Sequence, residues 1–235
     1  MRLDKYISKA LLLSRKAATE KIRSGNVTVN GKTVKSSDAQ VSENDVIAAD
    51  GKTAVYSEYV YLMMNKPAGV LSATEDGKGQ TVLDLLSQKY QNKGIFPVGR
   101  LDKDTVGLLI LTNDGQLAHG LLSPKHHVGK SYYLESEYPL SDEDVKKLCD
   151  GVMIDAETKT LPAKISKISD RAFVITVCEG KFHQIKRMLE AVENKVTFLE
   201  RIKFGGIELD RTLDRGQWRE LTEKEIKILK GSDSF

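Results

Sequence analysis

Residues 99–115 read GRLDKDTVGLLILTNDG and carry the clearest structural signal in the chain. A charged stretch between two glycines leads into an apolar strand, predicted over 107–112, which ends at an Asn-Asp-Gly turn. A loop beside a strand is exposed yet anchored, which suits it to hold reactive groups. Its carboxylates, Asp102 and Asp104, are candidates for acid–base chemistry. The alternative is an ordinary solvated turn, and the spacing alone does not choose between the two aspartates.

A second charged segment, residues 179–190 (EGKFHQIKRMLE), has the pattern of an amphipathic helix, predicted over 183–193. Its apolar residues recur at helical spacing, and Lys186 flanks them one turn from His183. Arg187 points away from the apolar stripe, towards solvent. Lys186 is therefore the cation better placed to reach an interior carboxylate. The alternative is a surface helix whose cations only extend over its own apolar edge.

Residues 123–134 (SPKHHVGKSYYL) combine two adjacent histidines with a pair of tyrosines. Neighbouring histidines rarely bind one metal ion together, and no third ligand follows at a metal-site spacing, so we predict no metal site. If this segment continues as a strand, alternation sends one ring of Tyr132 and Tyr133 into the core or a cleft and the other outward.

The chain from Tyr59 onward alternates short strands with isolated helices. This pattern predicts an α+β fold, a largely antiparallel mixed sheet with flanking helices. Capping-box spacings begin two of the helices, at Ser141 and at Thr222. The predicted strands are 60–65, 95–98, 107–112, 131–137, 163–168 and 172–178, and the predicted helices are 81–90, 142–150, 183–193 and 222–230.

The first part of the chain predicts a separate small unit. Residues 3–24 have the spacing of two helices, Asn30-Gly31 is a strong hairpin signal, and a further strand is predicted over 45–49. Residues 52–59 are the expected linker, which gives a first domain over 1–58 and a second over 59–235.

Charge is distributed unevenly between these parts. The whole chain has 36 Lys and Arg against 33 Asp and Glu, a net charge of +3. Residues 1–35 hold nine basic and two acidic side chains, a net of +7, so the rest of the chain has a net of −4. This excess predicts that the first unit binds a polyanion, against the alternative of a solvated helix face. The candidate phosphate contacts are Arg2, Ser14, Arg15, Lys16, Arg23, Asn30 and Lys32.

Composition excludes several other classes of protein. With 40% hydrophobic residues the chain can bury a core, so a disordered protein is not expected. Its apolar runs are too short to span a membrane, and no signal-peptide segment is expected at Met1. Two cysteines, Cys149 and Cys178, are too few for a disulfide framework, which fits a cytoplasmic protein.

Taken together, these segments resemble a pseudouridine synthase of the ribosomal small-subunit (RsuA) type, over essentially the whole chain. The motifs that carry the resemblance are Gly-Arg-Leu-Asp with Thr-x-Gly-Leu-Leu (99–109), Glu-Gly-Lys-Phe-His-Gln-Ile-Lys-Arg-Met (179–188) and Asn-Lys-Pro-x-Gly (65–69). The N-terminal unit is similar to the alpha-L RNA-binding fold, first known from a ribosomal small-subunit protein. The resemblance implies isomerisation of uridine to pseudouridine within RNA, a reaction that needs no cofactor.

The resemblance also implies roles for particular residues. Asp102 corresponds to the family's catalytic aspartate, which would attack either carbon 6 of the uracil or the anomeric carbon of the ribose, whereas Asp104 falls at a variable position. Lys186 corresponds to its basic partner, where many relatives in other branches have Arg, and Tyr132 to the tyrosine that stacks on the uracil. Arg100 is expected to help hold the target nucleotide out of its stack. Further RNA contacts are expected from Lys130, His183 and Arg187.

The segment 123–127 followed by Lys130-x-Tyr132 is similar to the branch that acts on small-subunit rRNA. The implied target is 16S rRNA or its assembly intermediate, at uridine 516 in the standard rRNA numbering, modified by a monomeric enzyme. Two alternatives remain open from the sequence: the same chemistry on 23S rRNA, and a non-catalytic RNA-binding assembly factor.

Overall fold

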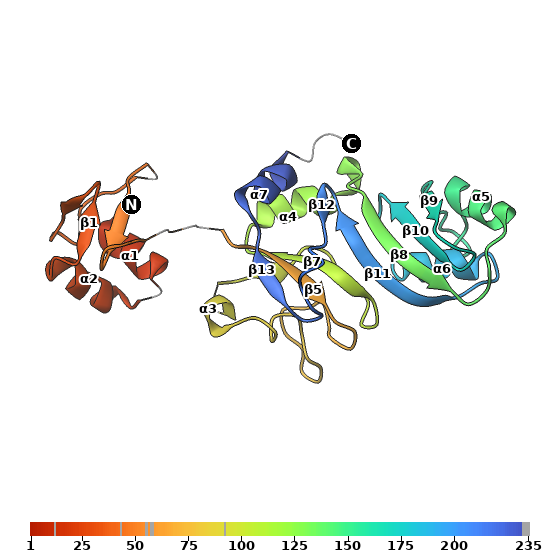
Figure 1. Ribbon diagram of the computed structural model, residues 1–235, viewed down its shortest axis with the longest axis horizontal. Helices are drawn as coiled ribbons and strands as arrows, with labels where there is room; N and C mark the ends of the chain where they lie inside the picture. The colour runs from red at the N-terminus through yellow and green to blue at the C-terminus, as the bar shows by residue number, and fades with distance from the viewer. Residues whose placement is uncertain (12, 43, 55, 57–58, 92, 232–235) are drawn as a thin grey trace. The chain divides into compact units, whose positions relative to one another are not determined.

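The computed structural model describes residues 1–231 except 12, 43, 55, 57, 58 and 92. The chain forms two compact units, Met1–Glu58 and Tyr59–Phe235 (Figure 1). Each unit has a buried core of its own.

The N-terminal unit packs two helices against a small antiparallel sheet. Ser14 caps the second helix, where its side chain accepts a hydrogen bond from the backbone N–H of Ala17 at 3.1 Å. Asn30 and Gly31 form the predicted hairpin turn, and both have positive φ, as a two-residue turn of this kind requires. The helices are α1 (Leu3–Ala10) and α2 (Arg15–Arg23), and the strands are β1 (Val27–Val29), β2 (Lys32–Thr33), β3 (Ile47–Ala49) and β4 (Lys52–Thr53), in the order β2-β1-β3-β4.

The second unit is an α+β body built around one mixed sheet, as the sequence predicts. Its strands are β5 (Tyr61–Lys66), β6 (Phe96–Pro97), β7 (Val106–Thr112), β8 (Lys130–Ser136), β9 (Lys164–Lys167), β10 (Ala172–Val177), β11 (Val196–Phe204), β12 (Ile207–Glu208) and β13 (Trp218–Glu220). Its helices are α3 (Gln88–Gln91), α4 (Gly115–Leu122), the 3₁₀ helix η1 (Pro124–His126), α5 (Asp142–Asp150), α6 (Gln184–Glu190) and α7 (Glu223–Lys230).

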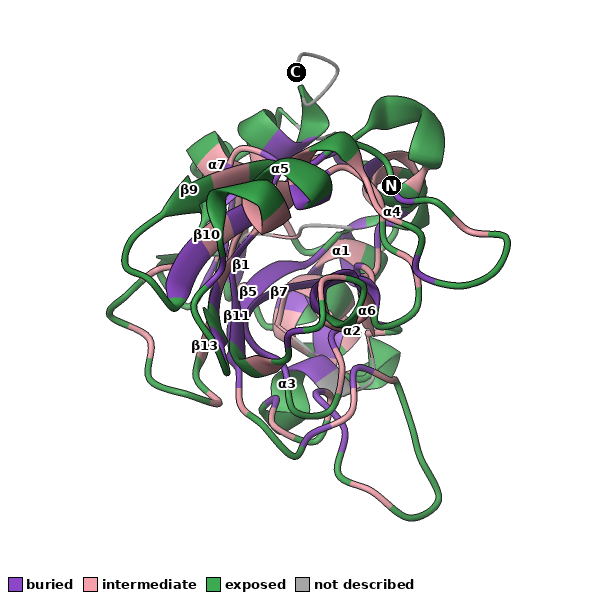
Figure 2. Cartoon of the chain, turned by 90° about the vertical axis from the view of Figure 1, so that its right-hand side faces the viewer, coloured by how far each residue is buried: buried purple, intermediate pink, exposed green. Residues whose placement is uncertain are grey.

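The sheet has the strand order β13-β5-β7-β11-β8-β10-β9, which Figure 1 shows as adjacent arrows. Among the described strands, β7 and β11 are the parallel pair, with Glu200 opposite Val106, and the other pairs are antiparallel. One face of the sheet packs against α5 and α6, and the other against α4 and α7. In Figure 2 the strands are largely buried, while the helices have exposed outer faces.

Two of the predicted boundaries are wrong. The segment 52–59 is not a plain linker, because Lys52 and Thr53 form β4 against β3. The helix predicted over 81–90 is reduced to α3, since the Asp84 carboxylate accepts hydrogen bonds from the backbone N–H and the hydroxyl of Thr81. Such side-chain bonds hold residues before α3 in tight turns and compete with a regular helix.

Several elements were not predicted at all. Residues 113–115 are predicted only as a turn at the end of a strand, but Asp114 also caps helix α4 by accepting from the backbone N–H of Leu117 at 3.0 Å. The strand β11 was also missed, because Glu200 and Arg201 interrupt its apolar pattern although both are buried. Helix α6 is shorter than the predicted 183–193.

Candidate active site

Lys66, the last residue of β5, holds the backbone of the loop that contains Asp102. The Lys66 side chain is fully buried, and its ammonium donates to the backbone carbonyls of Asp102 (3.1 Å), Lys103 (3.3 Å) and Thr105 (2.9 Å), as well as Pro67 (3.0 Å). Burial lowers the pKa of Lys66 to about 8. Lys66 belongs to the Asn-Lys-Pro-x-Gly motif at 65–69, whose sequence alone indicates no role for this side chain. Its contacts show that it positions the backbone of the loop.

Ser72 fixes the same loop one residue earlier. Its hydroxyl donates to the carbonyl of Leu101 at 2.9 Å and accepts from the backbone N–H of Leu101 at 3.0 Å. Gly107, the second residue of β7, has a φ of +99°, and a Cβ at this position would overlap the carbonyl oxygen of Arg201 on β11. The loop therefore joins the sheet where two backbones approach closely, which only glycine allows.

The Asp102 carboxylate meets two basic side chains from the α6 region. Lys186 Nζ lies 3.1 Å from Oδ2 of Asp102, and His183 Nε2 lies 3.6 Å from Oδ1. Lys186 also donates to both carboxylate oxygens of Asp104, at 2.6 and 2.9 Å. The helix thus brings Lys186 to the loop, as its spacing predicts, but the ammonium is shared between two carboxylates.

These contacts keep Lys186 charged. Burial by itself lowers the pKa of Lys186, but the hydrogen bonds with Asp104 and Asp102 outweigh it and raise that pKa above its usual value. The bond with Lys186 likewise lowers the pKa of Asp104. A fixed positive charge beside a carboxylate stabilises the ionised form that a nucleophile needs.

A cavity of about 610 Å³ opens beside Asp102. Tyr132 on β8 is buried and lines it, whereas Tyr133 packs on the other side of the strand against Phe198. Arg100 is exposed at the cavity. The structure therefore brings together predicted site residues from three separate segments: Arg100, Asp102, Lys130, Tyr132, His183 and Lys186.

Two buried cations form another part of the cavity wall. Arg201, which is 1% exposed, lies directly opposite Tyr132 on β11 and donates through Nε to the carbonyl of Leu108 at 2.7 Å. Its Nη2 has no hydrogen-bond partner among the described residues. Lys130 donates to the carbonyl of Val128 at 3.1 Å, and burial together with Arg201 lowers the pKa of Lys130 to about 8. The part of the cavity wall beside Tyr132 is therefore cationic.

Sequence reasoning did not find Arg201. The available signal was a charged pair, Glu200-Arg201, between apolar residues of a segment long enough to be a strand. The carboxylate of Glu200 forms ion pairs with Arg211 at 3.0 Å and Arg215 at 2.8 Å, and these arginines do not line the cavity.

Some of the remaining predicted RNA contacts already form ion pairs or hydrogen bonds within the protein, and others are exposed. Arg187 forms an ion pair with Asp155 at 2.8 Å. In the N-terminal unit, Arg2 and Arg15 both pair with the buried Asp4, at 3.1 and 2.9 Å. Ser14 is used as a helix cap, and Asn30 bonds Asp45 and Val46 across the hairpin. The exposed cations of this set are Lys16, Arg23 and Lys32, with Arg2 and Arg15 exposed in part of their length.

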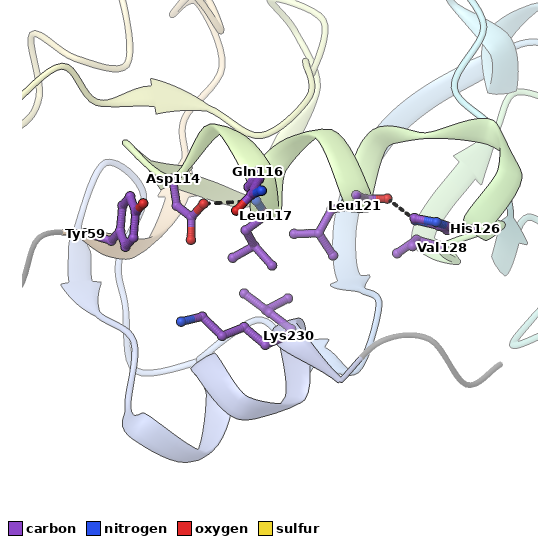
Figure 3. A pocket seen from close by; sticks show the side chains of 10 residues that line it. Tyr59, Asp114, Gln116, Leu117, Leu121, His126, Val128 and Lys230 are labelled. Atoms are coloured by element: carbon purple, nitrogen blue, oxygen red, sulfur yellow. Dashed lines mark hydrogen bonds between the residues drawn. The ribbon is translucent and has the colours of Figure 1, made fainter.

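A second cavity of about 360 Å³ lies between α4 and α7 (Figure 3). Tyr59, Asp114 and Lys230 line it, and it shares no lining residue with the cavity beside Asp102. Asp114 is already engaged there, because it accepts a hydrogen bond from the Tyr61 hydroxyl at 2.7 Å. His126 is turned to the carbonyl of Gly120 rather than towards Asp102.

No three His, Cys, Asp or Glu side chains among the described residues gather as a metal site. No helix in that part of the chain is long and apolar enough to cross a membrane.

Comparison with known families agrees with this arrangement. The model for RNA pseudouridylate synthase matches residues 60–191, which include Asp102, Tyr132 and Lys186, and the S4 domain model matches residues 1–47. The chain belongs to the RNA pseudouridine synthase family, whose members are isomerases.

Curated relatives match over nearly the whole length. The chain is 46% identical to the uncharacterized RNA pseudouridine synthase YtzG of Bacillus subtilis, over 97% of this chain and 98% of the relative. It is 40% identical to ribosomal small subunit pseudouridine synthase A of Vibrio cholerae, over 96% and 98% of the two chains. A crystal structure of a pseudouridylate synthase matches with a TM-score of 0.70 and 36% identity, over 97% of this chain and 99% of the other.

Proposed function

We propose that this protein isomerises one uridine of 16S rRNA to pseudouridine, and that Asp102 is the nucleophile. The observation that carries the proposal is the meeting of three side chains at one cavity. Asp102 lies on a loop held by Lys66, Lys186 Nζ lies 3.1 Å from its carboxylate, and Tyr132 lines the same cavity. A carboxylate beside a fixed cation and an aromatic ring is suited to attack and hold a flat, uncharged base.

The reaction moves one carbon–nitrogen bond to a carbon–carbon bond and leaves the composition of the nucleotide unchanged. Asp102 attacks either carbon 6 of the uracil or the anomeric carbon of the ribose, and the glycosidic bond to nitrogen 1 breaks. The base turns and carbon 5 bonds to the ribose. Asp102 is released, the proton on carbon 5 leaves, and nitrogen 1 takes up a proton, so the product is an isomer of uridine. Tyr132 stacks on the base meanwhile and is the candidate acceptor of that proton.

The target uridine must leave its stack to reach the cavity, which costs a few kcal/mol. Contacts to the RNA backbone offset this cost. The S4 domain supplies the exposed cations Lys16, Arg23 and Lys32, and Arg100 at the cavity supports the displaced nucleotide. Contacts of this kind fix the position of an RNA without reading its sequence.

The choice of small-subunit 16S rRNA is supported by the full-length similarity to relatives named ribosomal small subunit pseudouridine synthase A. Uridine 516 is the position that the family resemblance implies. The segment 123–127, which distinguishes this branch, lies at the end of α4 and in η1, and Ser123 and Pro124 line the cavity. Cytoplasmic location and a monomeric state stay predictions.

The test is chemical mapping of rRNA from cells that lack this protein. Carbodiimide modification stops reverse transcription at pseudouridine, so we expect one stop in 16S rRNA to disappear and wild-type protein to restore it. Asp102→Asn should not restore the stop although it still binds RNA. The matched control is Asp104→Asn, whose carboxylate is 72% exposed and shares the same lysine. Because exposed ion pairs contribute ~0–1 kcal/mol, this variant should keep activity within about fivefold.

The other outcomes each contradict a stated part of the proposal. A missing stop in 23S rRNA would contradict the target and keep the chemistry. Restoration by Asp102→Asn would contradict the nucleophile. An unchanged rRNA pattern, with RNA binding retained, would contradict the enzyme and favour an assembly factor.

A further inference from the structure

Phe182 is an apolar side chain held at the edge of the catalytic cavity. Its ring is 75% exposed, the highest exposure of any large hydrophobic residue in the described part of the chain, and it lines the cavity beside Asp102. A single exposed apolar residue needs no explanation by itself. Phe182 requires an explanation because its exposed ring lies at the cavity that Asp102 lines.

The backbone around Phe182 is fixed by hydrogen bonds. The Gln184 side chain accepts from the backbone N–H of Lys181 at 3.0 Å and donates to Glu179 at 2.8 Å. Arg187 donates to the Phe182 carbonyl at 3.4 Å, and His183 adopts a left-handed φ of +49°. The exposed ring is therefore built on a rigid turn.

One face of the ring is covered and the rest is exposed. The rings of Phe182 and His183 are stacked, with centroids 3.8 Å apart and an interplanar angle of 19°. His183 in turn lies 3.6 Å from the Asp102 carboxylate. The side chains thus follow one another outward from the reacting group as Asp102, His183 and Phe182, and the outer face of Phe182 continues the stack.

We propose that Phe182 is a stacking platform for the base that lies next to the target uridine in the RNA. The proposal rests on the proposed function, because the target uracil occupies the cavity beside Asp102. A base on the outer face of Phe182 lies one layer further out, which is the place of a neighbouring nucleotide and not of the target. Every base has a flat apolar face that an aromatic ring can stack on.

Charge complementarity favours RNA over an apolar protein segment as the occupant. The exposed side chains of Arg100 and Lys103 lie on the same cavity. Such cations suit the phosphates on either side of a stacked base. The platform also gives His183 a role: it supports the ring and connects it to the nucleophile.

The test is a double-mutant cycle between Phe182 and the neighbouring bases. The probes are a hairpin fragment of 16S rRNA that contains uridine 516 and two versions in which the nucleotide before or after it is abasic. Dissociation constants are measured in the Asp102→Asn background, so the readout needs no chemistry. The variants are Phe182→Ala, Phe182→Tyr and the control Tyr138→Ala, an aromatic that is 57% exposed and does not line the cavity.

We expect Phe182→Ala to weaken binding of the intact fragment roughly 5- to 150-fold, the range that corresponds to ~1–3 kcal/mol of base stacking. Phe182→Tyr and Tyr138→Ala should stay within about threefold. On one of the two abasic fragments the loss should vanish, because the partner base is already gone. The salt dependence of binding should not change, since no phosphate contact is removed.

An equal loss on all three fragments, or no loss on the intact one, would overturn the platform. The proposed function is read separately, from pseudouridine formation in the intact fragment by the enzyme that retains Asp102. If no pseudouridine forms but the loss of affinity in Phe182→Ala vanishes on one abasic fragment, the proposed reaction is contradicted and the stacking role of Phe182 is supported. If pseudouridine forms but the loss of affinity is the same on all fragments, the proposed reaction is supported and the stacking role is contradicted.

Discussion

We predict that the buried ammonium of Lys66 is required to keep the loop of Asp102 in position. Lys66→Met removes four hydrogen bonds at once and keeps the apolar stem of the side chain. The carbonyls of Asp102 and Lys103 retain another donor, from Thr105 and Gly69. Among the hydrogen bonds of the described residues, the carbonyls of Pro67 and Thr105 lose the only donor that they have.

The size of the effect follows from these contacts. Each buried carbonyl left without a donor costs ~1–3 kcal/mol, so the gross loss is ~2–6 kcal/mol. Methionine also removes the cost of burying a charge, which is visible in the lowered pKa of Lys66. We therefore expect the free energy of unfolding to fall by ~1–4 kcal/mol. The loop then relaxes, and a shift of ~1 Å in a reacting group costs on the order of 100-fold in rate.

The assay combines urea denaturation with single-turnover pseudouridine formation and RNA binding. Lys66→Met should lose stability and rate together, while the dissociation constant for RNA stays within about threefold. The control is Lys195→Met, which removes an exposed ammonium at the edge of β11. If Lys66→Met unfolded and reacted like wild type, the carbonyl contacts of Lys66 would not be what positions Asp102.

Three further predictions concern other parts of the molecule. Burial lowers the pKa of Lys130 to about 8, so its charge is lost as the pH rises through 8 and the affinity for RNA should fall there. In dissociation constants measured over a pH series, Lys130→Arg should show a smaller fall, because arginine stays charged. Replacing Lys16, Arg23 and Lys32 together by Ala should weaken RNA binding and lower its log–log salt slope by ~0.7 for each phosphate that is no longer neutralised, and an unchanged slope would contradict the role of these cations. Gly107→Ala should destabilise the body by ~2–5 kcal/mol in urea denaturation, because the new Cβ overlaps β11 and the φ is positive; a loss below ~0.5 kcal/mol would refute the close approach.

The sequence was informative wherever local pattern and burial agree. Lys186 flanks an apolar stripe, and this spacing alone predicts that it turns towards an interior carboxylate, which it does. Tyr132 alternates with an outward-facing neighbour and lines the cavity as the family motif implies. In both cases the side chain's direction is a property of its own helix or strand, so no distant contact has to be known.

The missed features depend on distant partners. Arg201 interrupts an apolar segment, and only the carbonyl of Leu108 and the ring of Phe204 make its burial acceptable. Lys66 is equally hidden, because its four carbonyl acceptors come mostly from a loop far along the chain. Asp104 was expected to have no catalytic role because it falls at a position that varies in the family, but its carboxylate shares Lys186 with Asp102. Contacts of this kind have no signature in local periodicity.

The parallel pairing of β7 with β11 has a consequence for the order in which the protein matures during synthesis. A nascent chain that ends after α6 already contains Asp102, Tyr132 and Lys186, but it lacks the strand that joins β7 to β8 in the sheet. The N-terminal unit is complete at residue 58, and domains generally fold as units from the N-terminus during synthesis. Capacity to hold RNA is therefore acquired early on the ribosome, and catalytic competence arrives only when the last quarter of the body is made.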